Sequence, residues 1–512
     1  MSRLSQIVST IRKAAALMLL PLLASSCHWM NEDYDCEETA DNSAAQYINI
    51  TISVSTGNFT RSNPTGGEYG DGPEKGIEDR ENKVNDITLI FYQDEAGINT
   101  NNGNAKVVCV KKYTVYPYEE PYYPIGHDHP EDEPYNVQTN EVLYTTGEQK
   151  LEETTLVAGE PYKLLVVANA PDDLGIAANQ VIASSDVRDK VLASVYEGSG
   201  VGINAQNFVM ASAAEATINL RNPRVYTSPT EAEKNRFVYY LDCIHIERLA
   251  ARIDFWAKES NGYKSSTDNA AYTTPGYEYT ISRPDGTATN DRFVLTSITP
   301  FNLNNGNEYL FKRTNDNASP YLANETFANW VTDPYTSVKN QNVHPDYFAS
   351  TLTSVIGNLN NTYNVTMASQ QSNKFDVTNA GFTADNIIVG YAKENTLRPQ
   401  GDSPLFYYAT GLAFEGYYYK GGTGTGERCV FYHFIRHQGE SNYAYPTYTN
   451  DNNSLEASKA VKYPSVPAMN FGIVRNNVYR ISVDKVSAKG GFIELSIREM
   501  CWRHIDNPVI YL

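Results

Sequence analysis

The order of apolar and polar residues along the chain predicts a protein built from β-strands. Between residues 47 and 55, four aliphatic side chains alternate with polar ones, and a period of two is typical of a strand with one buried face. The four aliphatic residues are Ile48, Ile50, Ile52 and Val54. Other apolar or alternating runs predict strands at 87–92, 107–110, 164–168, 237–241, 244–255, 293–298, 387–389, 406–419, 429–435, 479–483 and 493–497.

Short strands separated by polar loops are typical of β-sandwiches. The chain has 512 residues, and a length of roughly 100–200 residues per domain gives two to four domains. We therefore expect an all-β fold with few short helices. The best helical candidates are residues 178–195 and 455–461.

The first residues have the pattern of an export signal. Residues 1–26 carry three basic side chains and no acidic ones. Their apolar run, 14–24, is shorter than the ~18 residues that a membrane-spanning helix needs, but it suits a signal-peptide core. Small residues then precede Cys27, as in a bacterial lipobox, where a peptidase cuts before the cysteine and lipid is attached to its sulfur. An ordinary secretory signal followed by a chance cysteine remains the alternative.

Charge and cysteine content exclude several classes of protein. The net charge is −19, from 41 basic and 60 acidic side chains, and such a surplus of negative charge opposes binding to nucleic acid or to anionic lipid. The remaining cysteines are far apart and form no C-x-x-C pair, which argues against a disulfide scaffold or a zinc knuckle. They are Cys36, Cys109, Cys243, Cys429 and Cys501.

Motifs that could carry chemistry are weak. The sequence has no G-x-S-x-G, no P-loop and no dinucleotide fingerprint, so we expect neither an enzyme nor a cofactor. His127 and His129 could share a metal ion on an extended chain, although an acidic, proline-rich surface loop is the favoured interpretation. Tyr417–Tyr419 could stack on sugar rings, but aromatic residues in a strand more often pack within the sheet. The glycines at 420–426 indicate a hairpin loop.

Several short pieces along the chain match one known family in their order and spacing. They are 81–84 (ENKV), 156–159 (LVAG), 166–169 (VVAN), 208–212 (FVMAS), 247–253 (ERLAARI), 394–396 (ENT), 434–437 (FIRH), 469–479 (MNFGIVRNNVY) and Trp502. On these pieces the chain resembles the fimbrillin family, the type V pilins of Bacteroidetes, and in particular the major subunit of the short, or minor, fimbriae. The resemblance spans most of residues 47–502, but residues 111–150 and 302–385 match poorly.

The resemblance implies two transthyretin-like β-sandwich domains in tandem. It divides the chain into a lipoprotein signal peptide (1–26), a propeptide with the first strand (27–61), an N-terminal sandwich (62–242) and a C-terminal sandwich (243–512). The precursor would be an outer-membrane lipoprotein, held by lipid on Cys27, and the mature protein would be part of a surface fimbrium.

The resemblance also implies a maturation step. A trypsin-like protease would cut between Arg61 and Ser62, with Arg80 as the second candidate, and would release the first strand. The groove left by its four aliphatic side chains would be filled by the C-terminal tail of a neighbouring subunit, a form of strand addition. Refilling it would contribute about 6–12 kcal/mol, at ~1.5–3 kcal/mol for each buried side chain. The donor residues would be Ile505, Val509, Ile510, Tyr511 and Leu512.

The sequence therefore predicts a non-enzymatic structural subunit of a surface fimbrium that supports adhesion or biofilm formation. Its partners would be other copies of itself, other pilus subunits, the outer membrane and the processing protease; the surface ligand stays unidentified. One alternative is an anchor or tip subunit of the same pilus. Another is a surface glycan-binding lipoprotein.

Overall fold

The structure is a computed structural model of the whole chain. It describes residues 45–55, 79–94, 104–117, 141–150, 156, 160–183, 190–192, 206–212, 216–220, 224–227, 235–257, 259–265, 274–304, 306–314, 331–336, 363–364, 386–397, 408–435, 472–489 and 492–500. Within these ranges, no helix has both the length and the apolar character needed to cross a membrane.

The N-terminal half forms one large sheet. Its twelve strands among the described residues lie in the order β4-β5-β1-β13-β10-β7-β2-β3-β8, with β11 beside β7, β12 beside β13 and β6 beside β1. Their bounds are β1 (Ala45–Ser55), β2 (Asp86–Asp94), β3 (Asn104–Thr114), β4 (Tyr116–Pro117), β5 (Glu141–Thr145), β6 (Gln149–Lys150), β7 (Pro161–Ala168), β8 (Val181–Ala183), β10 (Met210–Ser212), β11 (Ala216–Asn219), β12 (Arg224–Thr227) and β13 (Asn235–Arg248).

The C-terminal half forms a second sheet. Its ten strands in the described ranges lie in the order β22-β14-β27-β16-β17-β24-β25, with β15 beside β16, β21 beside β17 and β28 beside β27. Their bounds are β14 (Ala251–Trp256), β15 (Tyr263–Lys264), β16 (Gly276–Ser282), β17 (Ala288–Phe301), β21 (Tyr363–Asn364), β22 (Asn386–Ala392), β24 (Gly411–Tyr419), β25 (Glu427–Phe434), β27 (Val478–Lys489) and β28 (Phe492–Met500).

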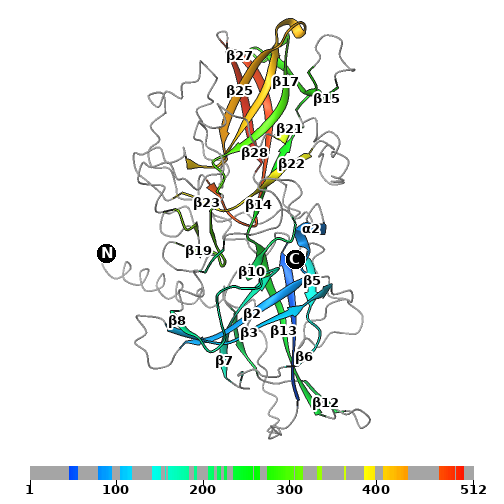
Figure 1. Cartoon of the computed structure of the whole chain (residues 1–512). Coiled ribbons are helices and arrows are strands. Elements are labelled where there is room, and N and C mark those ends of the chain that lie inside the picture. Colours follow the sequence, from blue (N-terminus) through cyan, green and yellow to red (C-terminus); the bar gives the residue numbers. More distant parts are fainter. Residues whose placement is uncertain are drawn as a thin grey trace, which may run out of the picture.

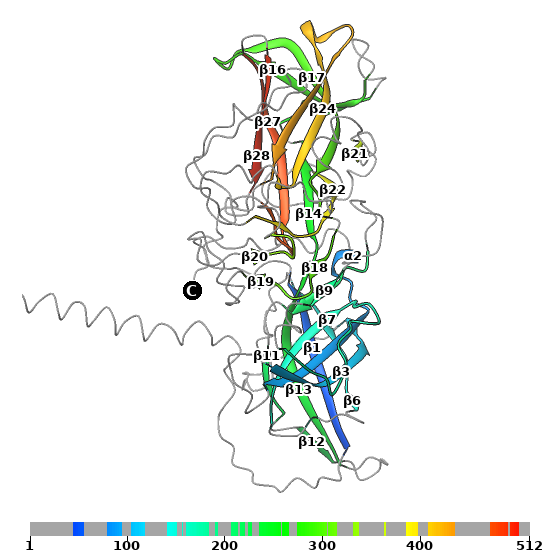
Figure 2. The same ribbon diagram turned by 60° about the vertical axis from the view of Figure 1, so that its left-hand side comes forward.

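Small elements lie between and beside the sheets. Three two-stranded ladders pair β9 (Val191–Leu192) with β18 (Glu308–Tyr309), β19 (Arg313–Thr314) with β20 (Val331–Thr332), and β23 (Asn395–Thr396) with β26 (Gly472–Ile473). The described helices are a single turn, α2 (Asp79–Asn82), and a 3-10 turn, η6 (Lys420–Gly422). In both views the two large sheets are stacked end to end, and α2 lies at the level where they meet (Figures 1 and 2).

The prediction of an all-β chain with β-sandwich domains in tandem is confirmed. Each large sheet packs on its own hydrophobic core. This agrees with the apolar runs that the sequence carries in both halves of the chain, because the apolar face of a sheet must be buried. The chain passes from one sheet to the other between Arg248 and Ala251. The division predicted between residues 242 and 243 falls within β13, a few residues earlier.

The predicted helix at 178–195 is wrong. Two strands, β8 and β9, occupy part of this range, and β8 pairs with the start of β3. Asn179 has a φ of 63°, which interrupts any helix there, and the β-branched pair Val181-Ile182 is well suited to a strand. The second helical candidate, 455–461, lies outside the described residues.

The glycine-rich stretch at 420–426 is a hairpin loop, as predicted. It joins β24 to β25, which pair in antiparallel register from Gly411↔Phe434 to Tyr418↔Glu427. Gly421, Gly422 and Gly424 have φ values of 66°, 72° and 86°. These left-handed conformations favour glycine.

Candidate functional site: the first strand and the junction between the sheets

The first strand, β1, lies inside the N-terminal sheet and not at its edge. It pairs in parallel with β13, from Ala45↔Arg236 to Val54↔Ile246. On its other side it pairs antiparallel with β5 and β6. Taking β1 away would therefore open the sheet between β13 on one side and β5 and β6 on the other.

The apolar side chains of β1 belong to the core of this half. Ile48, Ile50, Ile52 and Val54 are each 0% exposed and lie in the same cluster as residues of β2 and β7. Each contributes about 1.5–3 kcal/mol of transfer free energy, so the four together contribute roughly 6–12 kcal/mol. The structure thus brings together the four residues that the alternating pattern singled out.

The expectation that β1 is buried on only one face is wrong. Its polar residues Thr51 and Ser53 are 5% and 0% exposed. Neighbouring strands supply partners for Ser53 and for Asn49, a third polar residue of β1: His245 Nδ1 lies 3.3 Å from Ser53 Oγ, and Thr145 Oγ1 donates to Asn49 Oδ1 at 2.9 Å. Burial lowers the pKa of His245 below its usual value. A buried polar layer therefore backs the apolar face of β1.

The C-terminal end of β1 points toward the junction between the two sheets. Val54 lies opposite Ile246 of β13, and the next residues of β13, Glu247 and Arg248, extend into a buried polar network. Arg248 donates from its backbone nitrogen and from Nη1 to Asn476 Oδ1, at 3.1 and 2.9 Å. The β1–β13 ladder is therefore joined by hydrogen bonds to the loop that leads into β27.

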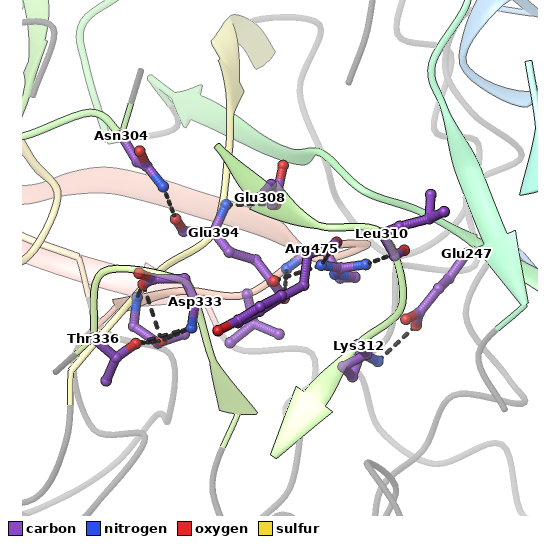
Figure 3. A network of polar contacts seen from close by, with 12 residues as sticks. Glu247, Asn304, Glu308, Leu310, Lys312, Asp333, Thr336, Glu394 and Arg475 are labelled. Carbon is purple, nitrogen blue, oxygen red and sulfur yellow. Dashed lines mark hydrogen bonds and ion pairs between the residues drawn. The ribbon is translucent and has the colours of Figure 1, made fainter. Parts of the chain in front are cut away.

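Two buried ion pairs form the centre of this network (Figure 3). Arg475 Nη2 lies 2.7 Å from Glu394 Oε2, and both side chains are 0% exposed. Lys312 Nζ lies 2.6 Å from Glu247 Oε2, and both side chains are 1% exposed. Since a buried charge without a partner is strongly destabilising, each pair requires both of its members.

Backbone groups complete the surroundings of Arg475. Its Nη1 donates to the carbonyl oxygen of Leu310 at 3.0 Å, and its Nη2 donates to that of Tyr309 at 2.5 Å. The backbone nitrogen of Glu394 donates to Glu308 Oε1 at 2.8 Å. Burial raises the pKa of Glu308 to about 8, opposed by the nearby charge of Arg475.

A second polar group, around Asp333, lies beside this centre (Figure 3). The carboxylate of Asp333 accepts from the backbone nitrogen of Thr396 at 2.6 Å, and its backbone nitrogen donates to Thr336 Oγ1 at 2.9 Å. In the described part of the chain, no three His, Cys, Asp or Glu side chains are grouped as a metal site. The charged groups of this network bond to one another and to backbone atoms. The network therefore joins elements that are far apart in sequence.

Other residues predicted for the site lie outside the described residues. These are Cys27, Arg61, Ser62, Ile505, Val509, Ile510, Tyr511 and Leu512, together with His127 and His129. Arg80 lies within α2.

The tyrosines at 417–419 do not form a single stacking platform. Tyr418 and Tyr419 point to opposite faces of β24, as successive residues of a strand must. The hydroxyl of Tyr418 donates to Asp291 Oδ2 at 3.0 Å; that of Tyr419, which is 2% exposed, donates to Thr274 Oγ1 at 2.9 Å. The geometry favours packing within the sheet over sugar stacking.

The residues of the junction were not recognised as functional from the sequence. Arg475 and Glu394 stand in two of the pieces that carry the family resemblance, and Glu247 stands in a third. Arg475 directly follows the apolar run Ile473-Val474. A charge directly at the end of an apolar run is the signal that could have indicated a buried ion pair, because charged residues are almost never fully buried unless paired.

Comparison with known proteins gives structural neighbours only. No model of a protein family matches the chain, and no curated protein matches it. Among solved structures, it is similar to a putative cell adhesion protein from Parabacteroides distasonis (13% identity, TM-score 0.40), covering 89% of this chain and 96% of that one. A fimbrial assembly protein from the same species has 12% identity and a TM-score of 0.31, with 89% and 96% covered.

A third similar structure is the tip fimbrial protein Mfa3 from Porphyromonas gingivalis, with a C-terminal truncation. It has 12% identity and a TM-score of 0.33, covering 89% of this chain and 100% of that one. All three TM-scores lie below 0.5.

Proposed function

We propose that this chain is a structural subunit of a cell-surface fimbrium that assembles by strand exchange and supports adhesion or biofilm formation. The observation that carries the proposal is the position of β1. It is the first described strand, it lies between β13 and β5, and its four aliphatic side chains are fully buried. One strand near the start of the chain thus occupies a complete slot in the core.

Only residues 56–78 connect β1 to α2 and the rest of the sheet. Arg61 stands within this segment, six residues beyond the last residue of β1. A cut between Arg61 and Ser62 by a trypsin-like protease would leave β1 held by non-covalent contacts alone. Its exchange for another strand would then become possible, because the replacement regains both the backbone ladder and the apolar contacts.

The replacing strand in this proposal is the C-terminal tail of a second copy or of another pilus subunit. The donor residues Ile505, Val509, Ile510, Tyr511 and Leu512 follow β28 in the chain. Export as an outer-membrane lipoprotein through Cys27 would bring the precursor to the cell surface before it is cut.

Mixing two defective chains tests the exchange. A chain without residues 503–512 that has been nicked with trypsin, and the trypsin then inhibited, can accept a tail but cannot donate one. An uncut Arg61→Gln chain can donate its tail but still holds β1. We expect the mixture to give dimers that survive SDS without boiling, and nicked full-length chain to give a ladder.

Each component alone is the matched control and should stay monomeric. Fibres from the tail-deleted chain alone, or a mixture that remains monomeric, would refute strand exchange. N-terminal sequencing of assembled fibres separates a stalk subunit from an anchor: a stalk subunit starts at Ser62, whereas an anchor keeps β1 and starts at Cys27.

A further inference from the structure

The one-turn helix α2 contacts both sheets with its last two residues. It follows residues 56–78 and directly precedes β2. Glu81 and Asn82 are 4% and 5% exposed. A turn this short is not stable by itself, because helix nucleation is unfavourable, so its side-chain contacts must hold it in place.

Glu81 binds the C-terminal sheet. Its Oε2 lies 2.8 Å from Arg252 Nη1 of β14, and its Oε1 accepts a hydrogen bond from the hydroxyl of Tyr391 in β22. Arg252 is in turn fixed by Asp254, through contacts of 2.9 Å from Nε and 3.1 Å from Nη2. The guanidinium is therefore shared between two carboxylates in a buried environment.

Asn82 binds the N-terminal sheet. Its Oδ1 accepts from Arg248 Nη2 of β13 at 3.0 Å, and its carbonyl oxygen accepts from the hydroxyl of Tyr144 in β5 at 2.9 Å. Two adjacent residues of α2 thus reach four strands, two in each sheet.

We propose that α2 is a clamp that joins the two sheets, remains in the processed subunit, and closes the Arg80–Glu81 bond to a trypsin-like protease. This inference rests on the proposed function, since it concerns the same cut. A protease binds several residues around the scissile bond in an extended form, so α2 would have to unwind first. Unwinding would leave Arg252 without one of its two carboxylates.

The clamp therefore decides between the two candidate cutting sites. With the Arg80–Glu81 bond protected, Arg61 is the remaining one of the two candidates. Lys75 also stands between Ser55 and Asp79, and trypsin itself could cut after it as well. None of the hydrogen bonds that hold Glu81 and Asn82 involves β1. The departure of β1 would leave the contacts with Arg248, Arg252 and Tyr391 in place. The contact with Tyr144 belongs to β5, which would lose its pairing with β1 until another strand replaces it.

Limited trypsin digestion of the purified full-length chain tests the clamp. The time course is followed by mass spectrometry of the new N-termini. We expect a product that starts at Ser62 early in the digest, and none that starts at Glu81 until denaturant is added. The denatured chain shows that trypsin can cut the Arg80–Glu81 bond at all.

A variant away from the cut opens the clamp without changing the scissile bond. Tyr391→Phe removes one hydrogen bond to the Glu81 carboxylate, and we expect cutting after Arg80 to become at least about tenfold faster. Tyr418→Phe is the matched control, because it removes a tyrosine–carboxylate hydrogen bond in the C-terminal sheet that does not involve α2. It should leave the digest unchanged.

Two outcomes would overturn the clamp: native chain cut after Arg80 as fast as after Arg61, or a Tyr391→Phe digest that matches the wild type. If Tyr391→Phe folds poorly, Arg252→Lys can take its place in the comparison. Lysine keeps the positive charge of residue 252 but loses one of the two carboxylate contacts, with Glu81 and Asp254, that the guanidinium makes. A cut after Arg80 followed by fibre growth would refute the clamp and leave strand exchange standing. A processed chain that starts at Ser62 but forms no fibres would refute strand exchange and leave the clamp standing.

Discussion

Replacing Ile50 by alanine should loosen β1 once the chain has been cut. Ile50 is 0% exposed and lies in the core of the N-terminal half. Truncating a fully buried isoleucine to alanine costs about 2–5 kcal/mol. At ~1.4 kcal/mol for each tenfold change in an equilibrium constant, the retention of β1 would weaken by roughly 30- to 4,000-fold. The backbone hydrogen bonds of Ile50 with Thr146, both 3.0 Å, are unaffected.

The assay compares nicked chains that retain or lose the β1 peptide. Wild type and Ile50→Ala are cut with a low dose of trypsin, the protease is inhibited, and the bound peptide is measured over time by size exclusion and mass spectrometry. The variant should lose the peptide earlier. It should also begin to form SDS-resistant polymers earlier, because an empty groove is available sooner.

A matched substitution in the other sheet separates this effect from general destabilisation. Ile281 of β16 is also 0% exposed and lies in the second core, so Ile281→Ala should lower the free energy of unfolding by a similar amount. It should not change the retention of β1. Equal peptide loss from both variants, or no difference between Ile50→Ala and the wild type, would show that the buried side chain of Ile50 does not hold β1 in the cut chain.

Three further predictions concern buried charges. Lys312→Met should lower the free energy of unfolding by about 3–5 kcal/mol, because Glu247 is left buried without its partner; adding Glu247→Gln should restore part of the loss, measured by urea unfolding. The pKa of Glu308 is raised to about 8, so the folded state binds the carboxyl proton more tightly than the unfolded chain does. The free energy of unfolding should therefore fall as pH rises from the ordinary carboxyl pKa through 8, and Glu308→Gln should flatten this part of the stability–pH profile. The pKa of His245 is lowered by burial, so the neutral ring is favoured and stability is lost as pH falls below the usual histidine pKa; nicked chain should release β1 faster in acid, because Ser53 then faces a charged ring, and His245→Asn should remove this acid dependence.

The strands were predictable where local pattern and local structure agree. The alternation at β1 and the continuous apolar run at 164–168 both correspond to strands of the N-terminal sheet. A period of two needs no knowledge of the partner strand. The second face of β1 was not predictable in the same way. Thr51 and Ser53 have the polarity of an exposed face, and only the neighbouring strands make them buried.

The wrong prediction of a helix at 178–195 shows that amino-acid composition alone does not determine secondary structure. Alanine-rich residues after a strand suggest a helix by propensity, but propensity is a weak prior that tertiary pairing overrides. Here the backbone of 181–183 completes the edge of β3 through ladder hydrogen bonds. The signal that could have prevented the error is Val181-Ile182, two β-branched residues in succession.

The junction could not be derived from the sequence because its partners are remote. Glu247 and Lys312 are 65 positions apart, and Glu394 and Arg475 are 81 apart. With 41 basic and 60 acidic side chains in the chain, charge alone offers too many pairings to choose from. Which of these pairs form buried contacts depends on which side chains become buried together, and this depends on how the two sheets meet.

The proposed strand exchange would make two demands that conflict if the same residues had to meet them. Before the proposed cut, β1 would have to fill its slot; after it, β1 would have to leave without separating the two halves of the subunit. In this structure different residues serve the two demands. The aliphatic side chains of β1 fill the slot, whereas Glu81 and Arg248 link the two sheets through charged contacts that do not involve β1. Weakening the junction and weakening the seat of β1 should therefore have additive effects on stability, as expected for sites that share no partner, and only the second should accelerate polymerisation.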